Sequence, residues 1–242
     1  MLELHSVSKW VGRGQAKKLV LDRLACRFEA KTHYAILGGR GSGKTVLLNV
    51  LSGALVPTSG WVERRGIVSS TAGLVRFGAG VTTPRQLARR LANLYSAEPE
   101  AVAHFVERFS GLAGAMDWPT RFLTRGERSR LGLALFYGLP CDFYLYDRRT
   151  GTKLPDMKEL VTRAYQGRRE QAGVIFTTSQ PKAALAFGGK GGILYKGTLT
   201  LYDTVEEAVE VFRRLEIVDQ PSTQQYVDEV ASDLEEIDDD IG

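Results

Sequence analysis

The stretch that decides the fold runs Gly38-Gly39-Arg40-Gly41-Ser42-Gly43-Lys44-Thr45, and it matches the pattern G-x-x-x-x-G-K-[ST]. A short apolar run at 34–37 precedes it, and a segment with helical spacing follows at 45–55. The stretch therefore joins a buried strand to an amphipathic helix. Glycines let a backbone wrap closely around an anion, and the helix N-terminus adds the positive end of its dipole. The stretch predicts a phosphate-binding loop.

The loop is expected to bind a nucleoside triphosphate, which we take to be ATP. Lys44 is expected to reach the β and γ phosphates, and the Thr45 hydroxyl is expected to bind Mg²⁺. An aspartate at a strand end should complete the Mg²⁺ shell, and Asp147 follows the apolar run 143–146. The backbone groups expected to cradle the phosphates belong to Gly38, Gly39, Gly41, Ser42 and Gly43.

Apolar runs alternate with helical patterns along most of the chain. The segment 84–138 has mostly helical periodicity, with one apolar face at Leu87, Leu91 and Leu94. Strand patterns flank this segment on both sides, which predicts an α/β core with a largely parallel sheet and an all-helical insertion. The predicted strands are 2–7, 19–28, 34–37, 61–62, 67–68, 143–146, 174–176, 193–195 and 199–201, and a further helix is predicted at 205–215.

The charge of the 242-residue chain is unevenly distributed. Eight of its 28 acidic residues lie in 228–242, which has no lysine or arginine, so the rest carries 32 basic and 20 acidic residues. A basic body suits a phosphate-bearing ligand, but also nucleic acid or an anionic membrane, and most often it is simply a solvated surface. Aromatic and basic residues do not interleave, so we expect no nucleic-acid partner.

Two cysteines, Cys26 and Cys141, lie in apolar runs that indicate strands, so we expect buried, inert thiols in a reducing compartment. No apolar run approaches the roughly 20 residues that a membrane span needs. The segment around Glu3 and His5 does not have the pattern of a signal peptide. We expect a cytoplasmic protein that can reach a membrane by docking on a partner.

Three further elements resemble one family, the ABC-transporter ATPases: Trp10 in the sequence Ser8-Lys9-Trp10, the turn at 57–62, and the segment 123–128 shortly before Asp147. The resemblance covers roughly residues 1–215. It implies a P-loop NTPase with a RecA-like core, an antiparallel β subdomain and an inserted helical subdomain. The implied divisions are an ATPase domain at 1–220, with its core at 1–80 and 141–220 and its helical part at about 81–140, and an acidic tail at 221–242.

The resemblance also implies roles and partners. Trp10 would stack on adenine, and Thr124 and Gly126 would touch the γ-phosphate held by an opposite subunit. Thr124 is equally a plain N-cap candidate, and both roles are compatible. The implied partners are an integral membrane permease subunit and a second ATPase subunit, in a homodimer or a heterodimer.

The runs 128–135 and 202–208 resemble the ATPase subunits of capsular-polysaccharide exporters of the ABC-2 type. That subgroup implies a peripheral protein on the cytoplasmic face of the inner (plasma) membrane. It also implies periplasmic or outer-membrane export partners, reached through the permease.

The sequence departs from the family where water is activated. Arg148 stands at the position of the usual glutamate, and Ser179 at that of the usual histidine. A guanidinium cannot accept a proton at neutral pH, so Arg148 cannot be a general base. It can instead hold a fixed charge near the γ-phosphate, or be an exposed charge without a role. The loop 77–81 has no glutamine for Mg²⁺, and 150–154 has no aspartate.

These departures predict an ATP-binding subunit whose own hydrolysis is weak or absent. A non-catalytic scaffold or regulatory module of a transport complex is the alternative. A soluble P-loop kinase or nucleic-acid ATPase is a weaker third alternative, because the segment 123–127 before Asp147 argues against it.

Overall fold

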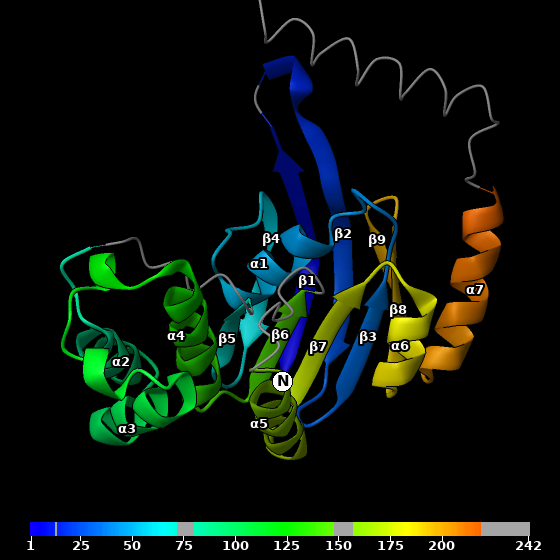
Figure 1. Cartoon of the computed structure of the whole chain (residues 1–242). Coiled ribbons are helices and arrows are strands. Elements are labelled where there is room, and N and C mark those ends of the chain that lie inside the picture. Colours follow the sequence, from blue (N-terminus) through cyan, green and yellow to red (C-terminus); the bar gives the residue numbers. More distant parts are fainter. Residues whose placement is uncertain (13, 72–79, 148–156, 219–242) are drawn as a thin grey trace, which may run out of the picture.

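The computed structural model describes residues 1–12, 14–71, 80–147 and 157–218. Within these residues the chain forms two sheets (Figure 1). The smaller sheet is antiparallel, with the order β2-β1-β4. Its strands are β1 (Leu2–Val11), β2 (Lys18–Phe28) and β4 (Ser59–Arg64). The β1–β2 hairpin extends beyond both sheets as an arm that ends near the short 3₁₀ helix Gly14–Ala16.

The larger sheet has the order β5-β6-β7-β3-β8-β9, and all its neighbours are parallel except β8 and β9. Its central strands are almost continuously apolar and buried, as expected for a parallel sheet that is covered on both faces. The strands are β3 (His33–Leu37), β5 (Val68–Thr71), β6 (Phe143–Asp147), β7 (Gly173–Thr178), β8 (Lys190–Tyr195) and β9 (Thr198–Tyr202).

Helix α1 (Lys44–Ser52) lies between the two sheets. Its buried residues Leu47, Leu48, Val50 and Leu51 share one core cluster with side chains of both sheets. The helix therefore holds the sheets together, and its N-terminus is fixed at the end of β3.

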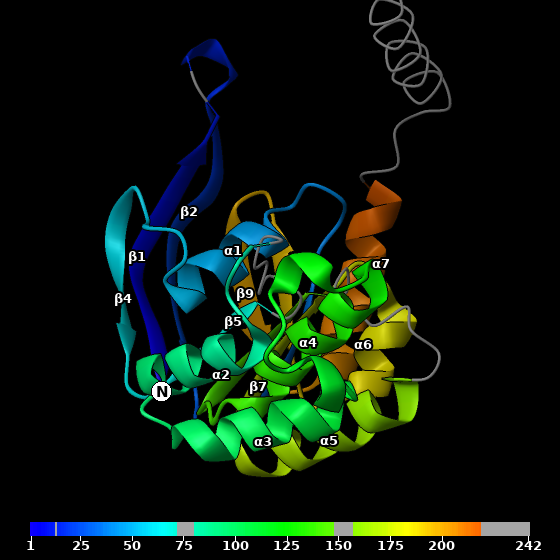
Figure 2. The ribbon, with the colours of Figure 1, turned by 60° about the vertical axis from the view of Figure 1, so that its left-hand side comes forward.

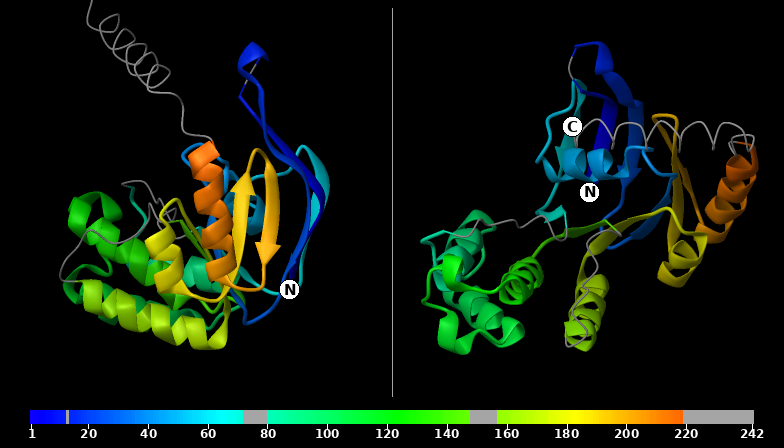
Figure 3. Two further views of the ribbon diagram at one scale, coloured as in Figure 1. Left: turned by 90° about the vertical axis from the view of Figure 1, so that its right-hand side faces the viewer. Right: turned by 45° about the horizontal axis from the view of Figure 1, so that its top comes forward.

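The opposite face of the larger sheet is covered by α6 (Pro181–Phe187) and α7 (Val205–Val218), as Figure 3 shows. Ala184 of α6 and Phe212 of α7 pack against Ala35 and Leu37 of β3. A further helix, α5 (Lys158–Gln171), precedes β7 and has no fully buried residue. Among the described residues, no helix combines the length and the apolar character that crossing a membrane would require.

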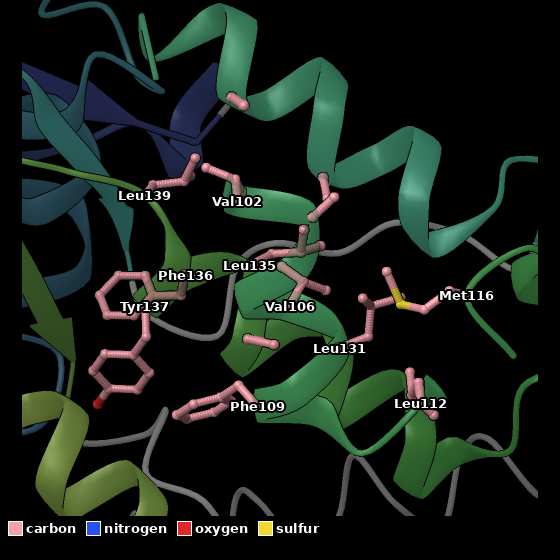
Figure 4. Close-up of a cluster of buried hydrophobic side chains, with 14 of the residues drawn as sticks. Val102, Val106, Phe109, Leu112, Met116, Leu131, Leu135, Phe136, Tyr137 and Leu139 are labelled. Atoms are coloured by element: carbon pink, nitrogen blue, oxygen red, sulfur yellow. The ribbon is translucent and has the colours of Figure 1, made fainter. Parts of the chain in front are cut away.

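A helical block lies to one side of the sheets (Figures 1 and 2). It contains α2 (Pro84–Leu94), α3 (Pro99–Ser110) and α4 (Arg125–Gly138), whose buried side chains form a core cluster that also reaches Tyr144 of β6 (Figure 4). These helices fall inside the predicted insertion at about 81–140. The exact division of the chain stays a prediction, and the acidic tail lies outside the described residues.

An aromatic cluster joins the helical block to the larger sheet. Phe136 of α4 makes edge-to-face contacts with Tyr144 and Tyr146 of β6, at 5.6 and 5.3 Å between ring centroids. Tyr146 continues the contact to Tyr165 of α5 at 5.4 Å. Because Tyr146 directly precedes Asp147, this cluster connects α4 with the strand that ends in that aspartate.

Several local predictions need correction. The strands predicted at 61–62 and 67–68 are both longer, as β4 and β5, and Ile67 lies just outside β5. They belong to different sheets, because β4 pairs with β1 and β5 pairs with β6. Leu94 does not continue the buried face of α2, since its side chain is 75 % exposed. Cys141 lies two residues before β6 rather than within a strand. Helices α5 and α6 were not predicted.

Candidate functional site

The glycine-rich loop begins where β3 ends. The amide of Gly38 donates to the carbonyl of Thr178 at the end of β7 (3.2 Å), which ties the loop to the neighbouring strand. The loop closes at Gly43, the N-cap residue of α1, whose carbonyl accepts from the amide of Leu47 (2.8 Å). The predicted order of strand, loop and helix is confirmed.

The glycines of this loop meet different constraints. Gly43 has a φ of 98°, and a Cβ there would lie 2.6 Å from Cγ1 of Val20. A Cβ on Gly38 would lie 2.8 Å from the carbonyl oxygen of Leu194. Gly41 has a φ of 76°, whereas a Cβ on Gly39 would meet nothing within 4 Å. Three of the four glycines are therefore required by the shape of the loop itself.

The ammonium of Lys44 lies against the loop backbone. It donates to the carbonyl oxygens of Gly38 and Gly39, both at 2.7 Å, and lies 3.4 Å from the hydroxyl of Ser42. The positive charge is thus held within the curve of the loop, next to the N-terminus of α1. This is the arrangement that an anion with several oxygen atoms requires.

Thr45 and Asp147 meet although 102 residues separate them. The Thr45 hydroxyl donates to Oδ2 of Asp147 at 2.7 Å, and Asp147 is only 7 % exposed. One hydroxyl and one carboxylate are oxygen ligands of the kind that Mg²⁺ prefers, and such ions usually keep several waters beside bound phosphates. The pair fits a magnesium ion held with a nucleotide.

A cavity of about 580 Å³ opens over this pair, a size typical of small-ligand sites. Arg40 and Lys44 contribute two cations to it, and Asp147 contributes the acidic group. The remaining lining residues come from the loop, from the first turn of α1, from β2 and from the end of β7 with the residue after it: Val20, Gly41, Ser42, Gly43, Thr45, Val46, Thr177, Thr178 and Ser179. Of the predicted residues, those from Gly41 to Thr45 and Asp147 therefore meet at one site, whereas Gly38 and Gly39 are not among the lining residues of this cavity.

Trp10 lies elsewhere in the described structure. It is near the end of β1, paired with Leu19, and is 40 % exposed. The ammonium of Lys17 lies 5.4 Å from its ring centroid, in a cation–π contact. Trp10 is not among the described residues that line the cavity. Its paired residue, Leu19, directly precedes Val20, which does line it. Stacking of Trp10 on adenine stays a prediction.

Thr124 and Gly126 lie at the start of α4, and neither belongs to the described lining of this cavity. Thr124 is the N-cap residue, as expected: its hydroxyl accepts from the amide of Glu127 (3.2 Å). The carboxylate of Glu127 accepts in turn from the amide and the hydroxyl of Thr124, at 2.7 and 2.8 Å. Both hydrogen bonds lower the pKa of Glu127, and the bond from the Thr124 amide has the larger effect. A contact with a nucleotide on an opposite subunit stays a prediction.

Of the two positions where the sequence departs from the family, 148 and 179, the structure describes only 179. Ser179 is exposed and lines the cavity, and its place at the position of the family's histidine stays a prediction. Arg148, the loop 77–79 and the segment 150–154 lie outside the described residues.

Both cysteines are free thiols away from this site; Cys141 is buried as expected, whereas Cys26 is only partly buried. Burial raises the pKa of the Cys26 thiol and of the Cys141 thiol to about 12, so both stay protonated at neutral pH. A protonated thiol is a poor nucleophile and metal ligand, which agrees with the expectation of inert cysteines.

Five lining residues were not predicted to belong to the site: Arg40 of the loop and Val46 of α1, and three from the strands β2 and β7. Val20 comes from β2, and Thr177 and Thr178 come from the end of β7. Only the neighbouring position of β7 beside β3 and β6 brings the two threonines to the loop. A possible signal was the run of three hydroxyl residues, 177–179, at the end of an apolar strand.

Comparison with known proteins defines the class. Residues 21–151, which contain the loop, the helical block and Asp147, match the family described as ABC transporter. The chain belongs to this family. It is accordingly an ATP-binding subunit of an ABC transporter, as the loop and the strand-end aspartate indicate.

Particular relatives cover nearly the whole chain. The ATP-binding protein BexA of Haemophilus influenzae is 24 % identical over 212 residues, which are 88 % of this chain and 98 % of that protein. The polysialic acid transport ATP-binding protein KpsT of Escherichia coli is 26 % identical over 88 % of this chain and 99 % of its own length. The capsule polysaccharide export ATP-binding protein CtrD of Neisseria meningitidis is 24 % identical over 89 % of this chain and 100 % of that protein.

Solved structures confirm the predicted fold. The dimeric structure of MJ0796, a bacterial ABC transporter cassette, has a TM-score of 0.66 and is 18 % identical. It covers 82 % of this chain, and 96 % of that chain is matched. The expected P-loop NTPase fold, with a mixed α/β core, an antiparallel sheet and inserted helices, is therefore correct.

Proposed function

We propose that the chain binds ATP with Mg²⁺ in the cavity between the glycine-rich loop and the end of β6. The observation that carries this proposal is the hydrogen bond between Thr45 and Asp147, beside the ammonium of Lys44. Lys44 and the loop amides would hold the phosphates, and the Thr45–Asp147 pair would hold the metal ion. The bound ion would neutralise phosphate charge and fix the orientation of the triphosphate.

Calorimetric titration of the folded protein with Mg·ATP tests this step. We expect saturable binding that becomes weaker by roughly one to two orders of magnitude when Lys44 is replaced by alanine. A folded chain that takes up no ATP at millimolar concentration would refute the proposal.

The transport substrate that we propose is a capsular or other cell-surface polysaccharide or glycolipid. Support comes from BexA, KpsT and CtrD, since the matches extend over almost the full length of each. Two of the three are named for the transport of polysialic acid or capsule polysaccharide. The chain would lie on the cytoplasmic face of the inner membrane, bound to an integral membrane permease with export partners beyond it.

Isolation of the complex from membranes tests this assignment. We expect a polytopic membrane protein to co-purify with the chain, and deletion of the chain to abolish surface polysaccharide. Normal surface polysaccharide after deletion would exclude the substrate class while leaving ATP binding untouched.

We propose further that the chain hydrolyses ATP weakly or not at all at its own site. The guanidinium of Arg148 cannot take a proton from water, and Ser179, with its neutral hydroxyl, lines the cavity. Loss of a catalytic base typically slows a reaction by about 10²–10⁴-fold. Steady-state hydrolysis at ordinary ATPase rates would exclude this part of the proposal. A gain in rate with Arg148→Glu combined with Ser179→His would support it.

A pair of ATPase subunits completes the proposed assembly. Thr124 and Gly126 lie away from the cavity of their own chain, which suits a contact with nucleotide on a facing subunit. Sedimentation with and without Mg·ATP tests this pairing, with either a second copy or an active homologue as the partner. A chain that stays monomeric with both candidates would count against it.

A non-catalytic scaffold is the second candidate, and the replaced residues at 148 and 179 favour it. The two functions differ in what happens when Lys44 is replaced by alanine. A scaffold keeps its complex with the permease and its transport activity. A nucleotide-driven subunit loses transport activity, even where its complex with the permease still forms.

A further inference from the structure

Thr177 carries a buried hydroxyl that no hydrogen bond within the described part of the chain satisfies. The residue is 0 % exposed, and its Oγ1 has no partner among the described residues. A buried polar group without a partner costs stability, and valine would fill nearly the same volume without that cost. The hydroxyl therefore lacks a partner among the residues that the structure describes.

The register of the sheet shows which way this side chain faces. Thr177 is paired with Asp147 of β6 on one side and with Ile36 of β3 on the other. Directly paired residues of parallel strands project from the same face of a sheet. Asp147 projects toward α1, where Thr45 contacts it, and Ile36 packs in the core cluster that contains α1. Thr177 consequently faces α1 and the cavity, which it lines.

The neighbouring Thr178 differs both in the face of the sheet from which it projects and in the hydrogen bonding of its hydroxyl. It is paired with Leu37, which packs in the cluster on the opposite face of the sheet. Its hydroxyl already accepts a hydrogen bond from the amide of Gln180 at 3.0 Å. The unsatisfied hydroxyl is thus specific to the position beside Asp147.

We propose that the Thr177 hydroxyl is a positioning group for the magnesium ion of the bound nucleotide. It accepts a hydrogen bond from a water of the metal shell, next to Thr45 and Asp147. Mg²⁺ usually keeps several of its waters, and the second-shell groups that orient such ligands strongly affect metal affinity. This inference rests on the proposed function, since it presupposes a nucleotide with its metal in this cavity.

The test separates nucleotide binding from the effect of magnesium. The affinity for a non-hydrolysable ATP analogue is measured by calorimetry in Mg²⁺ and in EDTA, for the unaltered chain, Thr177→Val and Thr177→Ser. We expect the gain in affinity due to Mg²⁺ to fall about threefold to tenfold in Thr177→Val, the range of a single hydrogen bond. The affinity in EDTA should stay unchanged, and Thr177→Ser should keep most of the gain.

Urea unfolding of the nucleotide-free proteins gives an independent measure. Thr177→Val should be at least as stable as the unaltered chain, because it removes an unsatisfied group. Thr71 is the matched control: it is also buried, but its hydroxyl lies 3.3 Å from Oδ1 of Asn49. Thr71→Val should lower stability and leave the magnesium effect intact.

Two results would overturn the inference, and they are distinguishable. If Thr177→Val, or Thr177→Ala as a second hydroxyl-free variant, keeps the full gain due to Mg²⁺, the hydroxyl does not serve the metal. If the unaltered chain binds no nucleotide in either buffer, the proposed function fails as well.

Discussion

Gly43 and Gly39 belong to the same loop but carry different steric constraints. Gly43 combines a positive φ with a close approach to Val20, whereas Gly39 faces open space. We expect Gly43→Ala to lower the free energy of unfolding by about 1–3 kcal/mol, because both strain and contact oppose the new Cβ. Gly39→Ala should change it by less than about 0.5 kcal/mol. Urea unfolding compares the two, and equal losses would show that the loop is held by something other than this geometry.

Lys44 supplies a charge that loop amides cannot replace. A hydrogen bond to a charged group contributes about 1.5–3 kcal/mol, so Lys44→Ala should weaken ATP binding by roughly one to two orders of magnitude. Isothermal titration measures this. The exposed Lys182 on α6 is the control, and its replacement by alanine should leave the affinity unchanged. Equal losses in both variants would mean that only overall charge matters.

The sequence predicts those parts of the site that are formed by residues consecutive in the chain. The loop motif identifies Lys44 and Thr45 because consecutive backbone groups form it. Asp147 could be inferred because a known loop implies a strand-end aspartate. Thr177 could not, because its importance depends on which strands become neighbours of β7. The position of Trp10 on an extended arm likewise follows from pairing across strands rather than from any local pattern.

At the level of elements, α4 begins with a reciprocal pair of hydrogen bonds between Thr124 and Glu127. Loss of such a cap costs about 0.5–2 kcal/mol. We therefore expect Thr124→Ala to destabilise the protein by an amount in this range near neutral pH, as measured by chemical unfolding. Thr162→Ala is a control, because Thr162 lies inside α5, is exposed and only donates to the carbonyl of Lys158 at 2.8 Å.

The same cap predicts a pH dependence with a definite sign. The folded protein holds the pKa of Glu127 below its usual value of 4.5, because the carboxylate accepts from Thr124. The carboxylate therefore adds stability above pH 4.5, and this contribution is lost as the pH falls through the lowered pKa. Unfolding of Glu127→Gln beside the unaltered chain should show a difference that shrinks in acid. A difference that grows in acid would contradict the cap.

The sequence predicts whether a segment is a helix or a strand better than it predicts the residues at which that segment begins and ends. Strands and helices with long apolar patterns, such as β2, β3 and α3, agree with their periodicity. Helix α5 has no fully buried residue, and its apolar stripe is short: only Val161, Ala164 and Tyr165 pack against the core, and they are partly buried. Leu94 follows the helical period but is exposed, because the end of α2 extends past the core that buries Ala88 and Ala92.

At the scale of the whole molecule, we expect two exposed apolar side chains to contact the proposed permease. Val81 and Phe122 are 70 % and 62 % exposed, and the amide of Arg121 donates to the carbonyl of Gly80 (3.1 Å), which holds their segments together. Exposed apolar groups that lie together often mark an interface. We expect Val81→Ser with Phe122→Ser to reduce co-purification of the permease without changing ATP affinity or stability.

Leu94 provides the matched control, because it is equally exposed on the same helical block. Leu94→Ser should leave the complex intact. If both variants lose the permease to the same degree, the effect reflects the block as a whole. If neither does, the partner contacts another surface.

Helix α1 touches both sheets through a single continuous core, and its first turn belongs to the phosphate-binding loop. A ligand that restrains this turn must restrain the layers on either side of it. Amide hydrogens far from the cavity, in β1 of one sheet and β3 of the other, should therefore exchange with deuterium more slowly, and by similar factors, once the ligand is bound. Ligand binding at the loop would thus reduce the local opening of both sheets through their shared contact with α1.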